Sequence, residues 1–376
     1  MTEWRNKLRH CQRVVIKVGT STLTYPNGKI NFSRMEALVR EMADIHNRGI
    51  EVMLVSSGAI GTGANRMGLS AVPRTLPEKQ ALAAIGQGTL LHLYEKLFSE
   101  YHQTVAQVLL TREDLDERLR YLNATNTLLA ILNYDVIPII NENDTVVVEE
   151  IKFGDNDTLS SLVAGLVNAD LLIILSDVDG LYDADPRQQV KAQLIPTVEH
   201  ITPEMEAQSL NRGIAFSSGG MLTKLNAARV CMSAGVPMVV ANSSTEHVLS
   251  RVLAGEELGT LFVPRQRRMH AREKWIAFGT VTQGAIVVDA GAAQALMQRG
   301  KSLLPSGICS VQGEFERGAV VSVLDLSGAE LARGLSNYSM KEIGRIAGHH
   351  SNEIEEILGE KDYDEVIHRN NLWIHA

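Results

Sequence analysis

The sequence has few cysteines and no motif that would pair them. Its three cysteines, Cys11, Cys231 and Cys309, are far apart, and no CxxC pattern occurs. This excludes a disulfide framework and a cysteine-based zinc site, and it fits a reducing compartment. The segment Met1–Arg13 is too polar for the apolar core of a signal peptide, and no later apolar run could span a membrane. We therefore expect a cytoplasmic protein with no membrane partner.

The sequence also has fewer basic than acidic residues. The 376 residues include 36 Lys and Arg against 44 Asp and Glu, a formal net charge of −8. Broad binding to nucleic acids or anionic membranes needs an excess of Lys and Arg, so nucleic acid is not an expected partner. A single hydrophobic core rarely extends beyond about 250–300 residues, so the length predicts two domains.

Several common catalytic motifs are missing. No GxxxxGK[ST] sequence occurs, which excludes a Walker-type phosphate loop, and no serine lies in the GxSxG frame of α/β-hydrolases. Gly61-Thr62-Gly63 begins like a dinucleotide-binding loop, but Arg66 stands where a third glycine or alanine belongs. Asp177-Val178-Asp179-Gly180 resembles part of a calcium loop, yet Gln188 replaces the final glutamate. No metal site made of protein ligands is predicted.

Four short apolar runs, each followed by small or acidic residues, are the most informative feature present. Continuous Val, Ile and Leu runs of this length are typical of strands buried on both faces, as in parallel sheets. In open parallel sheets, ligands bind outside the carboxyl ends of the strands. We therefore expect a polar, phosphorylated ligand beside the tips of the runs Val14–Val18, Val52–Val55, Val136–Ile140 and Leu171–Leu175.

The order of elements predicts two unlike domains. Strand-like runs alternate with stretches of helical periodicity at Phe32–Asn47, Glu78–Tyr101, Arg118–Leu132 and Thr158–Asn168. This alternation predicts an α/β fold, a three-layer αβα sandwich with a mostly parallel open sheet. After a basic stretch come short alternating runs separated by Gly and Ser turns, which indicate a small β-rich barrel. The predicted boundaries are a catalytic domain at 1–262, a linker at 263–275 and a second domain at 276–376.

Two glycine-containing elements are suited to holding phosphate. Lys17 lies in the first apolar run, just before Gly19, so a cation and backbone amides would meet at the ligand edge of the sheet. Gly219-Gly220 precedes an amphipathic helix with Lys224 in its first turn. A helix dipole disfavours a cation there, and an anionic ligand would explain Lys224. Either element alone is compatible with a simple turn, but the two together favour phosphate binding.

Read in order, these elements resemble the amino-acid kinase family, most closely its bacterial glutamate 5-kinases. The segments that carry the resemblance are VIKVGTS, VSSGAIGTG, INENDTV, KFGDNDTLS, LSDVDGLY and SSGGMLTK. The C-terminal segments GAIVVDAGAAQAL, KSLLPSGI, GEFERGAVVSV and IAGHHS resemble the PUA domain that those bacterial enzymes carry. LSDVDGLY is shared widely with uridylate kinases, whereas INENDTV, GDNDTLS and the PUA-like segment together are much more specific. The two resemblances cover nearly the whole chain.

The resemblance implies an activity and its partners. The reaction is the ATP-dependent phosphorylation of the side-chain carboxylate of L-glutamate to L-glutamate 5-phosphate, the first step of proline biosynthesis. ATP is the implied cofactor, with Mg held mainly by its phosphates. Feedback inhibition by L-proline and a homo-oligomer, a dimer or a tetramer, are implied as well, although no residue of the sequence indicates either.

The resemblance also implies roles for individual residues. Lys17 and Lys224 match the cations that hold the ATP phosphates and the transferring phosphoryl group, and Asp157 matches the acid that orients both. Ser57, Asp144 and Asn156 match positions that hold glutamate. The implied ATP site comprises Lys17, Gly19, Ser176, Asp177, Ser218, Gly219, Gly220, Met221, Leu222, Thr223 and Lys224. Ser218 departs slightly from the family pattern, where Thr or Gly is common.

Two alternatives remain open. A kinase of the same fold could act on N-acetylglutamate, aspartate or a nucleoside monophosphate, although the acid Asp144 suits a free ammonium group better than an acylated amine. The chain could instead bind or modify RNA through its PUA-like domain. Residues 276–376, however, contain 8 Lys and Arg against 13 Asp and Glu, a net charge of −5. Nucleic-acid-binding modules normally carry a basic face, so an interface or regulatory role is the expectation.

Overall fold

The computed structural model describes residues 3–25, 27–69, 71–147, 156–184, 192–210, 220–264, 276 and 281–374. The chain divides into two compact units, Met1–Asp114 with Leu122–Met269, and Leu115–Tyr121 with His270–Ala376. The predicted domain boundaries stay a proposal, because most of the predicted linker lies outside the described residues. None of the helices in the described part of the chain combines the length and the apolar character needed to cross a bilayer.

The first unit is built on a large, mostly parallel sheet. Its described strands follow the order β3-β4-β2-β1-β5-β7-β8-β6, and every neighbouring pair is parallel except β7 with β8. This confirms the predicted α/β sheet, and each of the four apolar runs forms a strand. The strands are β1 Arg13–Val18, β2 Glu51–Ser56, β3 Val105–Leu110, β4 Ile137–Glu142, β5 Leu171–Ser176, β6 Thr197–Val198, β7 Met238–Asn242 and β8 Thr260–Phe262.

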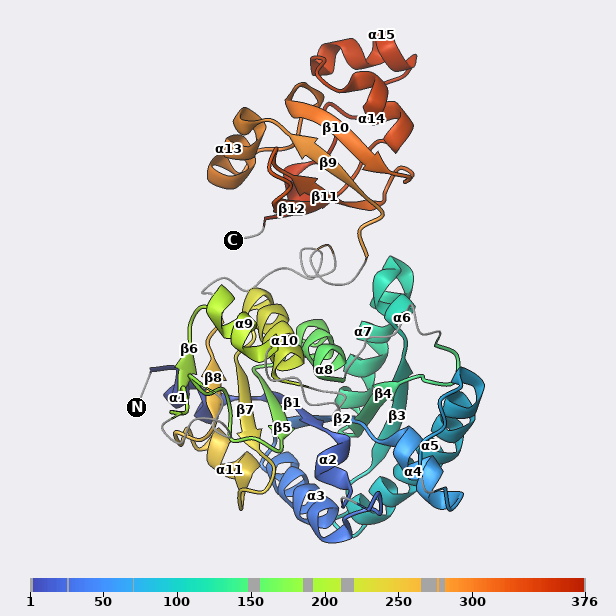
Figure 1. Ribbon diagram of the computed structural model, residues 1–376, viewed down its shortest axis with the longest axis vertical. Helices are drawn as coiled ribbons and strands as arrows, with labels where there is room; N and C mark the ends of the chain where they lie inside the picture. The colour runs from blue at the N-terminus through green and yellow to red at the C-terminus, as the bar shows by residue number, and fades with distance from the viewer. Residues whose placement is uncertain are drawn as a thin grey trace. The chain divides into compact units, whose positions relative to one another are not determined.

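Helices cover both faces of this sheet, with α8 and α10 on one face and α3 and α11 on the other (Figure 1). The predicted three-layer arrangement is therefore confirmed. The helices described before residue 264 are α1 Glu3–Lys7, α2 Thr20–Leu23, α3 Phe32–Asn47, α4 Ala59–Arg66, α5 Leu76–Ser99, α6 Arg112–Asp116, α7 Arg118–Asn133, α8 Asn156–Leu166, α9 Pro203–Leu210, α10 Met221–Ala234 and α11 Val248–Leu253; parts of α6 and α7 belong to the second unit.

Local sequence signals explain the bounds of α3. The side chain of Asn31 accepts a hydrogen bond from Arg34 N at 3.1 Å and so caps the first turn. Gly49, just after the helix, adopts a φ of +83°, which glycine adopts without steric cost. Met35, Val39 and Ile45 are fully buried against the sheet. The capping residues and the helical periodicity therefore indicate the same start and end, and the predicted bounds of this helix are confirmed.

Glycines bring α4 and α5 into backbone contact. A Cβ atom on Gly63 would lie 2.0 Å from Leu82 O, and one on Gly86 would lie 1.8 Å from Ala59 O. Neither distance is possible for a side chain, so both positions require glycine. This close contact fixes the position of α5 against α4, which follows directly on β2.

The second unit contains a smaller, mixed sheet with the strand order β10-β9-β11-β12-β13. β9 and β11 are parallel, and the other neighbouring pairs are antiparallel. The sequence predicted a small β-rich barrel; the β-rich character is confirmed, and the described strands form one five-stranded sheet. Its elements are β9 Gly284–Val288, α13 Ala290–Arg299, β10 Ile308–Gly313, β11 Val320–Leu324, β12 Glu330–Leu335, α14 Met340–Ile346, α15 Ile354–Leu358 and β13 Leu372–Ile374.

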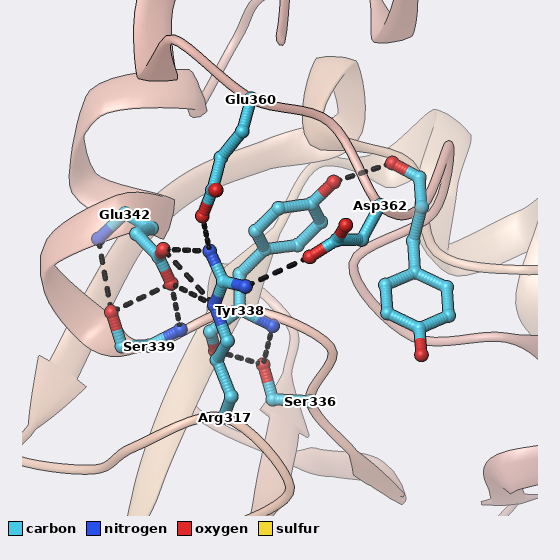
Figure 2. A network of polar contacts seen from close by, with 8 residues as sticks. Arg317, Ser336, Tyr338, Ser339, Glu342, Glu360 and Asp362 are labelled. Carbon is cyan, nitrogen blue, oxygen red and sulfur yellow. Dashed lines mark hydrogen bonds and ion pairs between the residues drawn. The ribbon is translucent and has the colours of Figure 1, made fainter. Parts of the chain in front are cut away.

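A single arginine ties three segments of this unit together (Figure 2). Arg317 donates to Glu342 in α14, to Glu360 at 2.9 Å and to Asp362 at 3.0 Å, and its guanidinium lies 5.8 Å from the ring centroid of Tyr338. Hydrogen bonding to Arg317 lowers the pKa of Glu342 to about 2. Charge-assisted hydrogen bonds of this kind are the stronger ones in proteins, so Arg317 anchors α14 and the turn after α15.

Candidate active site

The tips of the four predicted strands lie at one edge of the sheet. The parallel strands β4, β2, β1 and β5 are consecutive, so their carboxyl ends point the same way. Val18 at the end of β1 is paired with Ser56 at the end of β2, and Val18 O accepts a hydrogen bond from Ser57 N at 3.1 Å. The sequence prediction of a shared polar edge is confirmed. The residues that follow these strands are thereby gathered at one place.

Two buried lysines meet one buried carboxylate at this edge. Lys17 Nζ lies 2.6 Å from Asp157 Oδ1, and Lys224 Nζ lies 3.2 Å from Asp157 Oδ2. The exposed fractions of Lys17, Asp157 and Lys224 are 5%, 0% and 4%. Lysine and aspartate are almost never buried this deeply unless they are paired. The cluster therefore brings two lysine ammonium groups to the carboxyl ends of the strands.

The environment of Asp157 keeps its side chain ionised. Burial would raise the pKa of this carboxyl, but the charges of Lys17 and Lys224 and hydrogen bonds from Lys17 and Thr223 lower it to about 2. Asp157 also stands in the first turn of α8, where the helix dipole favours negative charge. Asp157 is thus a permanent anion at neutral pH.

Lys224 has a partner within the protein. It lies in the first turn of α10, which begins after Gly220 in extended conformation. Thr223 Oγ1 lies 2.7 Å from Gly220 O and 2.9 Å from Asp157 Oδ2, and so joins the start of α10 to the carboxylate. The helix-dipole argument explained this lysine by an anionic ligand, whereas the family resemblance paired it with Asp157. The ion pair with Asp157 accounts for the burial of Lys224.

A second cluster of amides and hydroxyls surrounds Asn156, the first residue of α8. Asn156 Nδ2 lies 2.8 Å from Ser57 Oγ, 2.9 Å from Asn141 Oδ1 and 3.1 Å from Ser56 O. Asn141 Nδ2 in turn donates to Gln87 Oε1 at 2.8 Å. Because Asn156 and Asp157 are adjacent, the amide cluster and the lysine cluster are neighbours.

The remaining predicted site residues are distributed along the same edge. Gly19 lies near Lys17, since a Cβ atom on it would be 3.5 Å from Lys17 Nζ. Asp144 is half-buried in the turn that follows β4. Ser176 ends β5, and its hydroxyl donates to Asp177 Oδ1 at 3.2 Å. Met221 and Leu222 are half-buried in the first turn of α10, whereas Ser218 and Gly219 lie outside the described residues.

Comparison with known proteins identifies the family of this chain. Residues 12–242 match the amino acid kinase family. The chain belongs to the amino acid kinase family. Residues 284–358 of this family member match the PUA domain.

Three curated relatives resemble the chain over nearly its full length. It is 55% identical to glutamate 5-kinase of Moorella thermoacetica, with 98% of each chain covered. It is 54% identical to glutamate 5-kinase of Carboxydothermus hydrogenoformans, over 98% of this chain and 99% of the relative. It is 49% identical to glutamate 5-kinase of Geobacter sulfurreducens, over 97% of this chain and 98% of the relative. Among solved structures, UMP kinase from Bacillus anthracis aligns with a TM-score of 0.47 at 19% identity, over 69% of this chain and 99% of its own.

Three residues of this kinase-family site were not predicted as site residues from the sequence. Gln87 and Tyr94 lie on α5, and Tyr94 Oη is 2.9 Å from Ser56 Oγ. Asn141 is the third, and it stands in the segment INENDTV without a predicted role of its own. Gln87 and Tyr94 are seven residues apart on one helix, which places them on the same face, but that spacing alone is equally typical of core packing.

The described residues contain no group of three or more His, Cys, Asp and Glu side chains that could hold a metal ion. Asp157 is unsuited to that task, because both of its oxygens already contact lysine ammonium groups.

Proposed function

We propose that this protein transfers the γ-phosphoryl group of ATP to the side-chain carboxylate of L-glutamate, which gives L-glutamate 5-phosphate for proline biosynthesis. The observation that carries this proposal is the 55% identity to a glutamate 5-kinase over 98% of both chains. The clusters around Asp157 and Asn156 support it, because two buried lysines lie next to polar side chains of the kind that bind an amino acid.

The chemistry needs no general base. A glutamate carboxylate is already ionised at neutral pH, so it can attack phosphorus without losing a proton. Phosphoryl transfer then depends on alignment of the reactants and on stabilisation of charge on the transferring group. In our proposal Lys17 and Lys224 supply that positive charge, and Asp157 holds both ammonium groups in position.

We assign the amino acid to the cluster around Asn156. Ser57, Asp144 and Asn156 would hold glutamate, with the Asp144 carboxylate facing its ammonium group. The nucleotide would lie along the tips of β1 and β5 and the start of α10, held by Lys17, Gly19, Ser176, Asp177, Ser218, Gly219, Gly220, Met221, Leu222, Thr223 and Lys224. Magnesium would enter with ATP, as part of the substrate complex.

The test is ATP turnover by the purified protein with magnesium present, with hydroxylamine to trap an acyl phosphate. L-Glutamate, N-acetyl-L-glutamate, L-aspartate and UMP are compared as acceptors. We expect turnover and hydroxamate with L-glutamate alone. Activity on another acceptor, with none on L-glutamate, would overturn the proposed substrate.

The expected regulation and assembly belong to the same proposal. We propose that L-proline inhibits the enzyme, that the protein is a homo-oligomer and that it acts in the cytoplasm, where ATP is available. Inhibition is checked by adding L-proline to the turnover assay, and assembly by light scattering after size-exclusion chromatography. A monomer at micromolar concentration would contradict the assembly proposal.

A further inference from the structure

Gln87, Asn141 and Asn156 form a chain of side-chain amides. Gln87 lies on α5, Asn141 near the end of β4 and Asn156 at the start of α8. Gln87 Oε1 is 2.8 Å from Asn141 Nδ2, and Asn141 Oδ1 is 2.9 Å from Asn156 Nδ2. The chain therefore connects a helix that no predicted site residue occupies to the centre of the proposed amino-acid site.

Backbone groups fix the direction of every hydrogen bond in this chain. The backbone N–H of Glu142 donates at 2.9 Å to the side chain of Asn141, so the atom that receives it must be the oxygen. The other end of Asn141 is then its NH₂ group, and Gln87 must present its oxygen to it. Asn156 lies 3.1 Å from the carbonyl oxygen of Ser56, which can only accept, so Asn156 must present its NH₂ group there.

This direction determines what the site offers to a ligand. Three acceptors surround Asn156 Nδ2, which has only two hydrogens, so the group that Asn156 can still offer is the acceptor Oδ1. Ser57 Oγ accepts from Asn156 at 2.8 Å, so its own hydrogen can be donated to another partner. One acceptor and one donor, side by side, match the ammonium and carboxylate groups of an α-amino acid.

We propose that Gln87 is a positioning residue that holds Asn141, and through it Asn156, so that the site presents an acceptor and a donor to the amino-acid substrate. The inference rests on the proposed function and deepens it. Gln87 can fill this role because Gly86, its neighbour, packs against Ala59 O and fixes this turn of α5. What position 87 contributes is a hydrogen-bond acceptor, and its NH₂ group is dispensable.

The first test compares two substitutions of Gln87 by steady-state kinetics. Gln87→Leu removes the acceptor that Asn141 Nδ2 bonds, and Asn141 is buried, so we expect the KM for L-glutamate to rise about 10-fold. kcat should stay within about 3-fold, and the KM for ATP should not change. Gln87→Glu keeps an acceptor and should leave the KM for L-glutamate within about 3-fold of the wild type. If Gln87→Glu were as impaired as Gln87→Leu, the proposal would be wrong.

Gln103→Leu is the matched control for these substitutions. Gln103 Nε2 also donates to a side-chain amide, Asn47 Oδ1, at 2.8 Å, but this hydrogen bond is exposed to solvent and Gln103 lies just before the amino end of β3. This substitution should leave both KM values unchanged. If Gln103→Leu raised the KM for L-glutamate as much as Gln87→Leu, the loss of any hydrogen bond between side-chain amides would have this effect. That result would also overturn the proposed role of Gln87.

A double-mutant cycle tests the direction of the chain. In Asn141→Asp, Gln87 can rotate its amide and donate to the introduced carboxylate, so we expect a modest rise in the KM for L-glutamate, about 3-fold. In the double variant Asn141→Asp with Gln87→Glu, two carboxylates face each other and neither can donate a hydrogen bond. We expect the KM for L-glutamate to rise about 100-fold, well above the product of the two single effects. A double variant that only multiplies the single effects would contradict the proposed direction.

A measurement on the ligand-free protein separates this inference from the proposed function. The side-chain amide protons of Asn156 should exchange slowly by NMR in the wild type and in Gln87→Glu, and several-fold faster in Gln87→Leu. This readout needs no substrate. If the wild type failed to phosphorylate L-glutamate, the proposed function would fail while the amide chain could still hold. Equal exchange in all three proteins would overturn the chain itself.

Discussion

Lys17 and Lys224 contact different oxygens of the same carboxylate, that of Asp157, at 2.6 and 3.2 Å. One lysine comes from β1 and the other from α10, so the pair exists only because α8 places Asp157 between them. A shared counter-ion holds two like charges together in the absence of any ligand. Both lysines are thereby held at the carboxyl ends of the strands, where an incoming phosphate could meet them.

The two lysines should be essential for turnover. We expect Lys17→Ala and Lys224→Ala each to lower kcat by about 100-fold or more, because each removes a donor that stabilises charge in the transition state. Steady-state kinetics with saturating L-glutamate and ATP measure this. Lys7→Ala, at an exposed position paired with Glu3, is the control and should keep full activity. Near wild-type kcat in either lysine variant would remove that lysine from the catalytic role.

Removal of the shared carboxylate should destabilise the ligand-free protein. Asp157→Asn leaves two buried cations without their counter-ion, and breaking a buried pair in this way costs about 3–5 kcal/mol. Thermal unfolding should show a lower Tm, and ATP should raise the Tm of this variant more than that of the wild type, because phosphates replace the lost negative charge. Asp44→Asn, in an exposed pair with Arg48, should leave Tm unchanged. An unaltered Tm in Asp157→Asn would contradict the structural role of the carboxylate.

The same ion pairs predict a dependence of stability on pH. The pKa of Asp157 is about 2 in the folded protein, below its ordinary value of 3.8. A lowered pKa means that the unfolded state binds the proton first, so the stabilisation is complete above about pH 4 and is lost as the pH falls towards 2. We expect the difference in unfolding free energy between wild type and Asp157→Asn to be constant at neutral pH and to shrink below pH 4. Urea titrations across this range measure it, and a difference that persisted undiminished at pH 2 would refute the assignment.

Substitutions in the amino-acid cluster should act on KM. We expect Ser57→Ala and Asp144→Ala to raise the KM for L-glutamate by about 10-fold or more, because each removes a polar partner of the substrate. The KM for ATP should change little. If both variants kept the wild-type KM for L-glutamate, the amino-acid site would have to lie elsewhere.

The contact between α4 and α5 makes opposite predictions for two nearby glycines. Gly86→Ala forces a Cβ atom to 1.8 Å from Ala59 O, so we expect a loss of about 1–3 kcal/mol in unfolding free energy. Gly88 lies on the same helix with nothing within 4 Å of its would-be Cβ atom. Gly88→Ala should therefore stabilise the protein by up to about 1 kcal/mol. Urea unfolding compares the two, and equal effects would contradict the close packing of α5.

The sequence predicted the sheet and most helices because their signals are local. Four apolar runs became the central parallel strands, and Phe32–Asn47 is a helix with the predicted bounds. The helix predicted at Thr158–Asn168 begins two residues earlier, at Asn156, and ends at Leu166. Asn156 and Asp157 precede the predicted start of this helix, yet both lie in its first turn, where polar side chains can satisfy free backbone amides.

The sequence by itself determined the fold class, the polar edge of the sheet and the two lysines, since strand periodicity and glycine placement act over a few residues. The family resemblance had already grouped Lys17, Asp157 and Lys224, and only the tertiary structure decided that they are buried and that Gln87 reaches Asn141. These contacts depend on the strand order β4-β2-β1-β5 and on glycine-mediated packing of α5. Both bring together residues that are far apart in the chain, so no local pattern specifies them.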